Sequence, residues 1–215
     1  MASFEIEIKS LLGIKDNADK LIKRLQLDPS FQSLGSHMQL NHYFINGDLH
    51  KLSDKLSLSL DSSFGKAKDV SLRTRLADDK VLLVIKATVD DTTSSNGTAR
   101  MEFETEIGLT LEKLDQALLD CGFEYQAKWS RERQDFKYQG LNVTVDKNAG
   151  YGYLAEFEKV IDNQSQADAV KGQIREIMAN LGLLELNQDR LARMFDFYNK
   201  NWQDYYGTEK VFNIE

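Results

Sequence analysis

Residues 3–9 read SFEIEIK, and the two-sided pattern of this stretch is the starting point for the fold. Strict alternation of apolar and charged residues has the period of a β-strand, whose successive side chains point to opposite faces. The sequence therefore predicts a strand with one apolar face and one charged face. The two faces are Phe4, Ile6 and Ile8 on one side, and Glu5, Glu7 and Lys9 on the other.

Later segments repeat this design. Residues two apart on a strand project to the same side, about 7 Å from one another, so each charged pair points into one shared space. For any single pair, a solvent-facing strand explains the pattern. The recurrence instead favours a sheet with a continuous charged face. The residues that carry it are Arg73 and Arg75, Lys86, Arg100, Glu102 and Glu104, Arg131 and Arg133, Asp146, and Glu156 and Glu158.

The apolar faces of the same strands are expected to lie under helices. Amphipathic helices need an apolar sheet surface, and residues such as Ile6, Phe103 and Phe157 supply it. The charged faces then lie on the side away from the helices. Closing the sheet into a barrel turns that side inward. We therefore expect a barrel with a charged interior and helices on its outside.

Four segments carry apolar residues at helical spacing. Asp16 and Thr110 are the expected N-caps of the first two, and Ser165 with Asp168 suggests a capping box for the third. The last carries an aromatic stripe, ending at Trp202, that is expected to dock on the sheet. A turn-rich stretch covers residues 90–97. Further strands are expected at residues 38–46, 55–60, 70–77, 80–89, 99–108, 125–138, 141–147 and 152–161.

Composition limits the class of protein. The chain has 215 residues, 41% of them hydrophobic, which suits one domain of residues 1–215. A formal net charge of −7 argues against a surface that coats nucleic acid. The sequence shows neither a membrane span nor a signal peptide, so we expect a cytoplasmic protein without a membrane partner. The single cysteine, Cys121, is expected in the core rather than in a catalytic site.

A charged interior predicts a ligand. Burying unpaired charges costs several kcal/mol each, so such an interior cannot be an ordinary packing core. Carboxylates at spacing two can hold Mg²⁺ or Mn²⁺, and Arg and Lys donate to phosphate oxygens. The two sets together predict a polyphosphate–metal site. The histidines at positions 37, 42 and 50 match no compact metal spacing and predict no zinc site.

With these residues in view, the sequence resembles the CYTH superfamily, the triphosphate tunnel metalloenzymes, whose members include class IV adenylyl cyclases, thiamine triphosphatases and inorganic triphosphatases. EIEIK at residues 5–9 is similar to the family signature ExExK. The resemblance implies an α+β fold: an eight-stranded antiparallel β tunnel, or barrel, with helices packed on its outside. The similar stretches that follow in family order are YF at 43–44, LRTR at 72–75, VLLVIKA ending after Lys86, RMEFETE from Arg100, RERQ from Arg131, and the segment from Asp146 through GYGYLAEFE to Glu158.

The resemblance also implies site roles, with one or two Mg²⁺ or Mn²⁺ ions and a small triphosphate substrate. The implied metal ligands are Glu5, Glu7, Asp146, Glu156 and Glu158. The implied phosphate-binding residues are Lys9, Arg73, Arg75, Lys86, Arg100, Arg131 and Arg133. Lys9, Glu5 and Glu7 are the expected catalytic residues, with Lys9 either a phosphate contact or a proton-transfer group.

Two parts of the family pattern give no firm site role in this chain. Glu102 and Glu104 fall within it, and pairing with the arginines is an alternative role for them. The family commonly has an aspartate just after the YF pair, whereas Ile45 and Asn46 stand there in this chain. No ligand is therefore expected from that strand.

The leading functional prediction is metal-dependent hydrolysis of the terminal phosphate of inorganic triphosphate, thiamine triphosphate or a nucleoside triphosphate. The alternative is a class IV adenylyl cyclase that converts ATP to cyclic AMP and pyrophosphate. No residue marks a base-recognition pocket, so the sequence does not choose between them. The late carboxylates disfavour a non-catalytic polyphosphate-binding module, and the charged faces disfavour a lipocalin-like carrier. The oligomeric state stays open.

Overall fold

The computed structural model describes residues 4–60, 64, 70–88 and 100–215. At residues 4, 87–88, 100–102 and 164 only the backbone is described. The turn-rich stretch at residues 90–97 lies outside the described residues. Within the described residues, no helix combines the length and apolar composition needed to cross a membrane.

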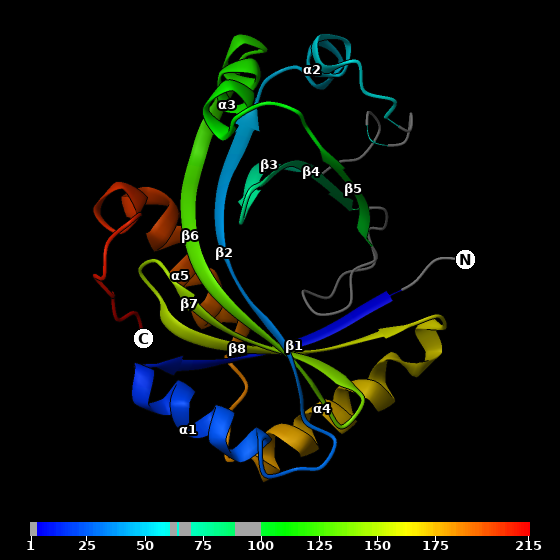
Figure 1. Ribbon diagram of the computed structural model, residues 1–215, viewed down its shortest axis with the longest axis vertical. Coiled ribbons are helices and arrows are strands. Elements are labelled where there is room, and N and C mark those ends of the chain that lie inside the picture. Colours follow the sequence, from blue (N-terminus) through cyan, green and yellow to red (C-terminus); the bar gives the residue numbers. More distant parts are fainter. Residues whose placement is uncertain (1–3, 61–63, 65–69, 89–99) are drawn as a thin grey trace. The chain divides into compact units, whose positions relative to one another are not determined.

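The strands form one eight-stranded antiparallel sheet in the order β1-β8-β7-β6-β2-β3-β4-β5, with β1 and β5 at its two ends (Figure 1). The predicted α+β class, with eight antiparallel strands and packed helices, is confirmed. The tunnel, or barrel, was also predicted, but among the described residues no ladder of hydrogen bonds joins β1 to β5. The strands are β1 (Phe4–Gly13), β2 (Gln32–Asn46), β3 (Val70–Ala77), β4 (Lys80–Thr88), β5 (Arg100–Glu106), β6 (Phe123–Tyr138), β7 (Leu141–Asn148) and β8 (Gly152–Ile161).

Among the described residues, helices interrupt the order of strands at three places, and two more follow the last strand. The four predicted helices are present, and a fifth, α2, occupies a segment for which none was predicted. The helices are α1 (Lys15–Leu25), α2 (Leu49–Leu56), α3 (Leu111–Asp120), α4 (Ala167–Asn180) and α5 (Gln188–Asn201), with short 3-10 turns η2 (Gln164–Gln166) and η3 (Trp202–Asp204).

The chain divides into two compact units, which are described separately. Unit 1 contains Met1–His37 and Arg131–Glu215, and unit 2 contains Met38–Asp91 and Ala99–Ser130. The long strands β2 and β6 contribute residues to both units. The expectation of one domain stays a prediction.

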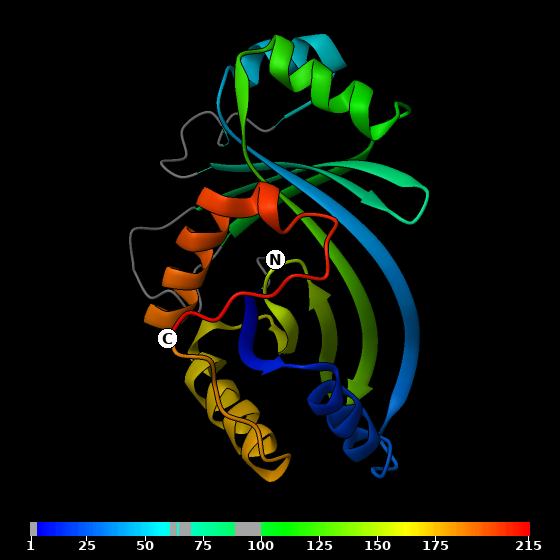
Figure 2. The same ribbon diagram turned by 90° about the vertical axis from the view of Figure 1, so that its left-hand side faces the viewer.

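In unit 1, α1 and α4 cover the apolar face of β1, β8, β7 and the end of β6 (Figure 2). Ile6 and Ile8 are buried there as the alternation of residues 3–9 predicted. Phe157 of β8 and Ile174 of α4 belong to the same hydrophobic core. Gly152 brings the start of β8 against the end of β1, because a Cβ at that position would lie 2.3 Å from the Gly13 carbonyl oxygen.

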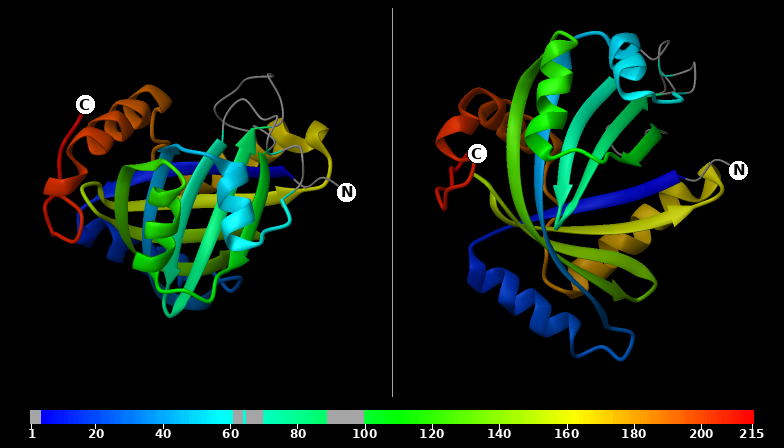
Figure 3. Two further views of the ribbon diagram at one scale, coloured as in Figure 1. Left: turned by 90° about the horizontal axis from the view of Figure 1, so that it is seen from above. Right: turned by 45° about the horizontal axis from the view of Figure 1, so that its top comes forward.

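In unit 2, α2 and α3 pack beside one another over the apolar face of β3, β4 and the adjoining strands (Figure 3). Leu83 and Ile85 of β4 and Leu114 of α3 are fully buried in this second hydrophobic core. Cys121, at the end of α3, is also buried there, as expected. Helices α1 and α4 in unit 1, and α2 and α3 in unit 2, therefore lie on the apolar side of the sheet.

Some local predictions were wrong. Residues 55–60, predicted as a strand, instead begin with the end of α2, which Asp48 caps by accepting from the backbone N–H groups of His50 and Lys51. Helix α1 has Ile14 at its N-cap, and Asp16 lies in the first turn. Helix α4 begins after Gln166 without a side-chain cap. The Thr110 cap of α3 is confirmed by its bond from the Lys113 N–H group.

Candidate functional site

One face of the unit 1 sheet collects the charged residues of four strands, and strand register places them. Glu7 of β1 lies directly opposite Glu158 of β8, and Lys9 lies opposite Glu156. Directly opposed residues of antiparallel strands share a face. We call this set the first charged face. Its charged site residues are Glu5, Glu7 and Lys9 of β1, Glu156 and Glu158 of β8, Asp146 of β7, and Arg131 and Arg133 of β6.

Lys9 links the first two strands of this face. Its ammonium donates to Glu7 on its own strand and to Glu156 Oε1 on β8, the latter at 2.9 Å. The second Glu156 oxygen accepts from Arg133 Nη2 at 2.8 Å. A single carboxylate thus lies between a lysine of β1 and an arginine of β6, so the positions of three side chains are coupled.

Asp146 anchors the two arginines of β6. Arg133 donates to both its oxygens, from Nε at 2.7 Å and from Nη2 at 2.6 Å, and Arg131 Nη1 donates at 3.1 Å. The Asp146 side chain has no exposed surface, so these bonds compensate a fully buried charge. Burial opposes the charge of Arg133, but Asp146 and Glu156 outweigh it and raise the pKa of the guanidinium.

Glu156 is held ionised by its surroundings. Burial alone would raise its pKa, but the charges of Lys9 and Arg133 outweigh burial and lower the pKa to about 2. Its carboxylate is therefore charged throughout the physiological range. It balances the two cations beside it rather than serving as a proton donor.

Glu7 and Glu158 form a like-charge pair directly across two strands. Like charges at opposed positions repel, and each carboxylate here has a separate partner: Lys9 for Glu7, and the Asn142 amide for Glu158 at 3.1 Å. Glu5 lies exposed on the same face, opposite Val160. These three carboxylates form the most acidic part of the face.

Thr144 on the same face carries a buried hydroxyl group whose hydrogen-bonding capacity is unused within the described part of the chain. It lies opposite Glu156 on β8 and Asp135 on β6. Its Oγ1 is buried and has no hydrogen-bond partner among the described residues. Because buried polar groups are nearly always bonded, this atom marks a point on the face where a water molecule or ligand oxygen fits.

The donor chemistry of this face fits a hard divalent cation. The carboxylates of Glu5, Glu7 and Glu158 lie on neighbouring strands and supply the oxygen ligands that Mg²⁺ and Mn²⁺ prefer. Within the described part of the chain, no three Asp, Glu, His or Cys side chains already converge as a metal site. The metal-ligand assignments, including Asp146 and Glu156, therefore stay predictions.

Unit 2 has its own charged face, which we call the second charged face: Arg73 and Arg75 of β3, Lys86 of β4, Glu104 of β5, and Asn41 and Tyr43 of β2. Arg73 Nη1 donates to the Tyr43 hydroxyl at 2.7 Å, and its guanidinium lies 5.5 Å from the centre of that ring. Arg75 donates to Asn41 Oδ1 at 3.0 Å and to Glu104 at 3.1 Å. The Nε of Arg73 is buried and has no hydrogen-bond partner among the described residues.

Other predicted residues are placed only in part. The backbones of Arg100 and Glu102 lie in β5, opposite Thr88 and Lys86, but their side chains lie outside the described residues. Glu104 pairs with Arg75, in agreement with the alternative role considered for it. The assignments of Arg100 and Lys86 to phosphate binding stay predictions.

Known proteins share this fold and part of this sequence. The chain is 26% identical over 189 residues to a Methanocaldococcus jannaschii protein named "Putative adenylate cyclase", covering 88% of this chain and 94% of that protein. This chain is thus similar in sequence to a protein that is named as an adenylate cyclase. This likeness agrees with the CYTH resemblance of the sequence. No family model matches the chain.

Solved structures support the resemblance. A conserved Pyrococcus furiosus protein has a TM-score of 0.60 at 22% identity, over 84% of this chain and 91% of that one. A Hippeastrum protein, described as a "putative adenylyl cyclase" with a dominant triphosphatase activity, has a TM-score of 0.53 at 19% identity, over 88% and 95%. At these identities the likeness shows a shared fold. Together with the M. jannaschii relative, it confirms the CYTH resemblance.

Sequence reasoning missed a buried polar cluster behind the second charged face. Asp115 of α3 accepts hydrogen bonds from His42 Nδ1 of β2, Thr74 of β3 and Tyr125 of β6. Burial acts to raise the pKa of Asp115, but these hydrogen bonds outweigh burial and lower it. The available signal was an aspartate on the apolar side of a helix between Leu114 and Leu118, where an unpaired carboxylate is costly.

Two of the three histidines contact aspartates. His42 belongs to the Asp115 cluster, and His37 pairs with Asp135 at 3.1 Å. Among the described residues, no group of three or more His, Cys, Asp or Glu side chains could hold a metal ion as placed. His42 and His37 therefore contact different aspartates, and His50 contributes its backbone N–H group to the Asp48 cap.

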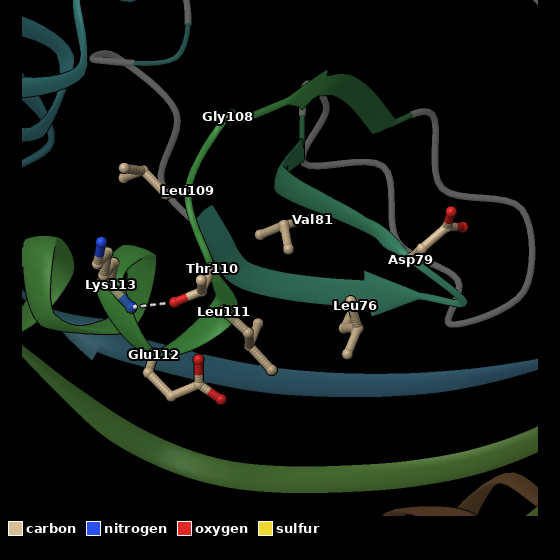
Figure 4. Close-up of a pocket in the computed structure, with 9 residues that line it drawn as sticks. All are labelled: Leu76, Asp79, Val81, Gly108, Leu109, Thr110, Leu111, Glu112 and Lys113. Atoms are coloured by element: carbon tan, nitrogen blue, oxygen red, sulfur yellow. Dashed lines mark hydrogen bonds between the residues drawn. The ribbon is translucent and has the colours of Figure 1, made fainter.

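A cavity of about 460 Å³ lies at the N-terminal end of α3 (Figure 4). Its lining comes from Leu76, Val81 and the segment from Gly108 to Lys113, and the dashed bond in the figure is the Thr110 cap. Leu76 and Val81 face each other across β3 and β4, on the apolar side of that sheet. None of the predicted site residues lines this cavity among those described, so it is separate from both charged faces.

Proposed function

We propose that this protein is a divalent-metal-dependent triphosphatase that hydrolyses the terminal phosphate of a triphosphate. The observation that carries the proposal is the first charged face, where carboxylates of β1, β8 and β7 share one side of the sheet with cations of β1 and β6. A face of one sign would suit either a cation or an anion. A face with both signs suits a metal bound together with a polyphosphate.

The proposed metal ligands divide into two groups by their contacts. Glu5, Glu7 and Glu158 form the acidic part of the face and would contact the cation directly. Asp146 and Glu156, whose oxygens accept from Arg133, would also hold it or orient its water ligands. When bound, Mg²⁺ or Mn²⁺ would neutralise phosphate charge and polarise the phosphoryl group that is transferred.

The proposed phosphate contacts are Lys9, Arg131 and Arg133 in unit 1 and Arg73, Arg75, Lys86 and Arg100 in unit 2. The buried Nε of Arg73 supports its role, because a phosphate oxygen would complete its hydrogen bonding. The buried hydroxyl of Thr144 offers a similar bond on the first charged face. On each unit, these donors would bind phosphate oxygens of the triphosphate.

The residues of β1 would handle the attacking water and its proton. Glu7 is the proposed acceptor that orients the water, with Glu5 beside it on the same face. Lys9, bonded to both Glu7 and Glu156, would contact a phosphate oxygen or assist proton transfer. We expect turnover to require both β1 carboxylates.

A class IV adenylyl cyclase is the second candidate, favoured by the name of the M. jannaschii relative. In that reaction the 3′-hydroxyl oxygen of ATP attacks the α-phosphorus, and pyrophosphate leaves. The dominant triphosphatase activity named for the Hippeastrum protein favours hydrolysis as the main reaction. The same charged residues would serve either reaction, so only the products separate them.

One experiment decides between the two. The protein is incubated with Mg²⁺ or Mn²⁺ and, separately, inorganic triphosphate, thiamine triphosphate and ATP, and the products are identified by phosphorus NMR. Orthophosphate release indicates the triphosphatase, and cyclic AMP with pyrophosphate indicates the cyclase. Absence of both products with every substrate and metal would contradict the enzymatic proposal. A parallel reaction in EDTA measures the dependence on metal.

A further inference from the structure

Three successive residue pairs between β2 and β3 place the second charged face directly in front of the Asp115 cluster. Asn41 lies opposite Arg75, His42 opposite Thr74, and Tyr43 opposite Arg73. Alternate pairs on neighbouring strands point to opposite faces. The middle pair, His42 and Thr74, therefore points toward α3, and the pairs on either side of it belong to the second charged face.

Asp115 joins the two members of that middle pair. Its Oδ1 accepts from Thr74 Oγ1 at 2.6 Å, and its Oδ2 accepts from His42 Nδ1 at 2.6 Å and from Tyr125 at 2.8 Å. The side chains of both Asp115 and His42 are only 6% exposed. One buried carboxylate thus fixes two opposed strands at one level, and a third strand beside them.

The two arginines depend on the strand spacing that this carboxylate fixes. Arg75 Nε reaches Asn41 across the strands at 3.0 Å, and Arg73 reaches Tyr43 at 2.7 Å. Each bond spans β2 and β3, one residue away from the level where Asp115 holds them. A change in spacing or twist at the middle pair would therefore alter both arginine contacts together.

We propose that Asp115 is a positioning residue that orients Arg73 and Arg75 for phosphate from the opposite side of the sheet. The inference rests on the proposed function, in which these two arginines bind the triphosphate. Stability alone does not call for a carboxylate here, because an apolar side chain of similar size often stabilises a buried site at least as well. A fully bonded polar cluster instead fixes one arrangement of the strands.

The test follows the arginines themselves. Exchange of the Arg75 Nε–H proton with solvent is measured by ¹⁵N NMR in the wild type, Asp115→Asn, Thr74→Val and Thr74→Ser. Thr74→Val removes the hydroxyl donor with little change in shape, whereas Thr74→Ser keeps the donor. We expect exchange about tenfold faster in Asp115→Asn and Thr74→Val, and near the wild-type rate in Thr74→Ser.

A matched control separates positioning from stability. Leu114 is the neighbour of Asp115 on α3 and is fully buried, so Leu114→Ala destabilises the same helix without removing a bond of the cluster. Arg75 exchange should stay near the wild-type rate in Leu114→Ala. Equal exchange in wild type and Asp115→Asn, or equal acceleration in Leu114→Ala, would overturn the proposal.

Binding supplies the functional measurement. Titration calorimetry with inorganic triphosphate in EDTA measures phosphate binding without turnover, and we expect Asp115→Asn and Thr74→Val to weaken it about tenfold while Thr74→Ser does not. If the variants bind as tightly as the wild type, the positioning role is wrong. If the wild type itself does not bind triphosphate, the phosphate role of the arginines fails, and the exchange measurement still decides whether Asp115 positions them.

Discussion

The two charged faces differ in what holds their cations. On the first charged face, lysine and arginine are held by carboxylates: Lys9 and Arg133 share Glu156, and Arg133 also binds Asp146. On the second, Arg73 donates to the neutral hydroxyl of Tyr43, whereas Arg75 donates from Nε to the neutral amide oxygen of Asn41 and from Nη1 to the Glu104 carboxylate. A carboxylate orients a cation and cancels its charge. A neutral oxygen orients the cation and leaves its charge in place.

This difference suggests a division of work between the faces. The first charged face is nearly balanced around Arg133 and presents its remaining negative charge at Glu5, Glu7 and Glu158, which suits a cation. On the second charged face, Arg73 is oriented by a neutral oxygen and keeps its positive charge, which suits phosphate. The variants below test two consequences: that the carboxylate-bound Arg133 stabilises the fold, and that the orientation of Arg73 by a neutral oxygen strengthens phosphate binding.

The largest expected effect is on stability, at Arg133. Arg133→Met should destabilise the protein by about 3–5 kcal/mol, because it leaves the fully buried Asp146 and the buried side of Glu156 with less compensation. Urea unfolding measures the change. The control is Arg175→Met, which breaks the exposed pair with Glu185 and should cost about 0–1 kcal/mol. Similar losses in both variants would contradict the structural role of the first face.

Acid should weaken the same network. The pKa of Glu156 is lower in the folded protein, about 2, than the usual value of about 4.3 in unfolded chains. Its contribution to stability is therefore fully present above the unfolded value and is lost as the pH falls toward 2. The difference corresponds to about 3 kcal/mol.

The Glu156→Gln variant isolates this contribution. Unfolding free energies of wild type and variant should differ most near pH 6 and converge as the pH approaches 2.5. The contribution of Asp115, whose pKa is also lowered, is common to both proteins and cancels in the comparison. A constant difference across this pH range would show that the ionisation of Glu156 does not stabilise the fold.

Next in size is the effect on turnover at the acidic part of the first face. Glu158→Gln should reduce metal-dependent turnover by about 100-fold or more, since it removes a proposed metal ligand. The melting temperature should stay the same or rise slightly, because Glu158 lies opposite Glu7 and the change relieves their repulsion. Glu5→Gln should reduce turnover to a similar extent, because Glu5 is also a proposed metal ligand.

A matched control for this loss is Glu132→Gln. Glu132 is exposed on the opposite side of β6, between Arg131 and Arg133, and pairs with Lys147. Its variant should retain wild-type kcat and metal dependence. Wild-type turnover in both Glu158→Gln and Glu5→Gln would remove the metal assignment of the first face.

The alternation of residues 3–9 was enough to predict which side chains are buried in β1. Ile6 and Ile8 lie in the core, and Glu7 and Lys9 lie on the charged face, because side-chain direction in a strand depends only on parity. The same rule placed Arg131, Arg133, Glu156 and Glu158 on one face. Local periodicity therefore carried both the strands and the membership of the first charged face.

Pairing partners could not be predicted in this way. That Asp146 binds both arginines, and that Asp115 bonds to His42, depends on which strands are neighbours and in what register. Asp115 and His42 are 73 residues apart, so no local pattern encodes their contact. Asp146 is only 13 and 15 residues from the two arginines, but its contacts depend on the register of the β6–β7 pair, which alternation alone does not determine. Helix α2 was missed for a related reason: its eight residues are too few for a clear helical period, and the Asp48 cap was not recognised.

The smallest expected effect is at Tyr43 of the second charged face. Tyr43→Phe removes the neutral oxygen that accepts from Arg73 at 2.7 Å but keeps the ring beneath the guanidinium. Arg73 keeps its full charge and loses only orientation, so binding of inorganic triphosphate should weaken by about 3- to 10-fold, or roughly 1 kcal/mol. Arg73→Ala, which removes the charge as well, should weaken binding further.

Tyr138→Phe provides the control for a lost phenol group. Tyr138 is buried in the unit 1 core, on the side of the sheet away from the first charged face. Its hydroxyl accepts one long hydrogen bond, from Gln139 Nε2 at 3.4 Å. Titration calorimetry should give wild-type affinity for this variant. If Tyr43→Phe also binds like the wild type while Arg73→Ala does not, the charge of Arg73 suffices without the orienting oxygen. The contrast between the two faces would then lie in charge alone.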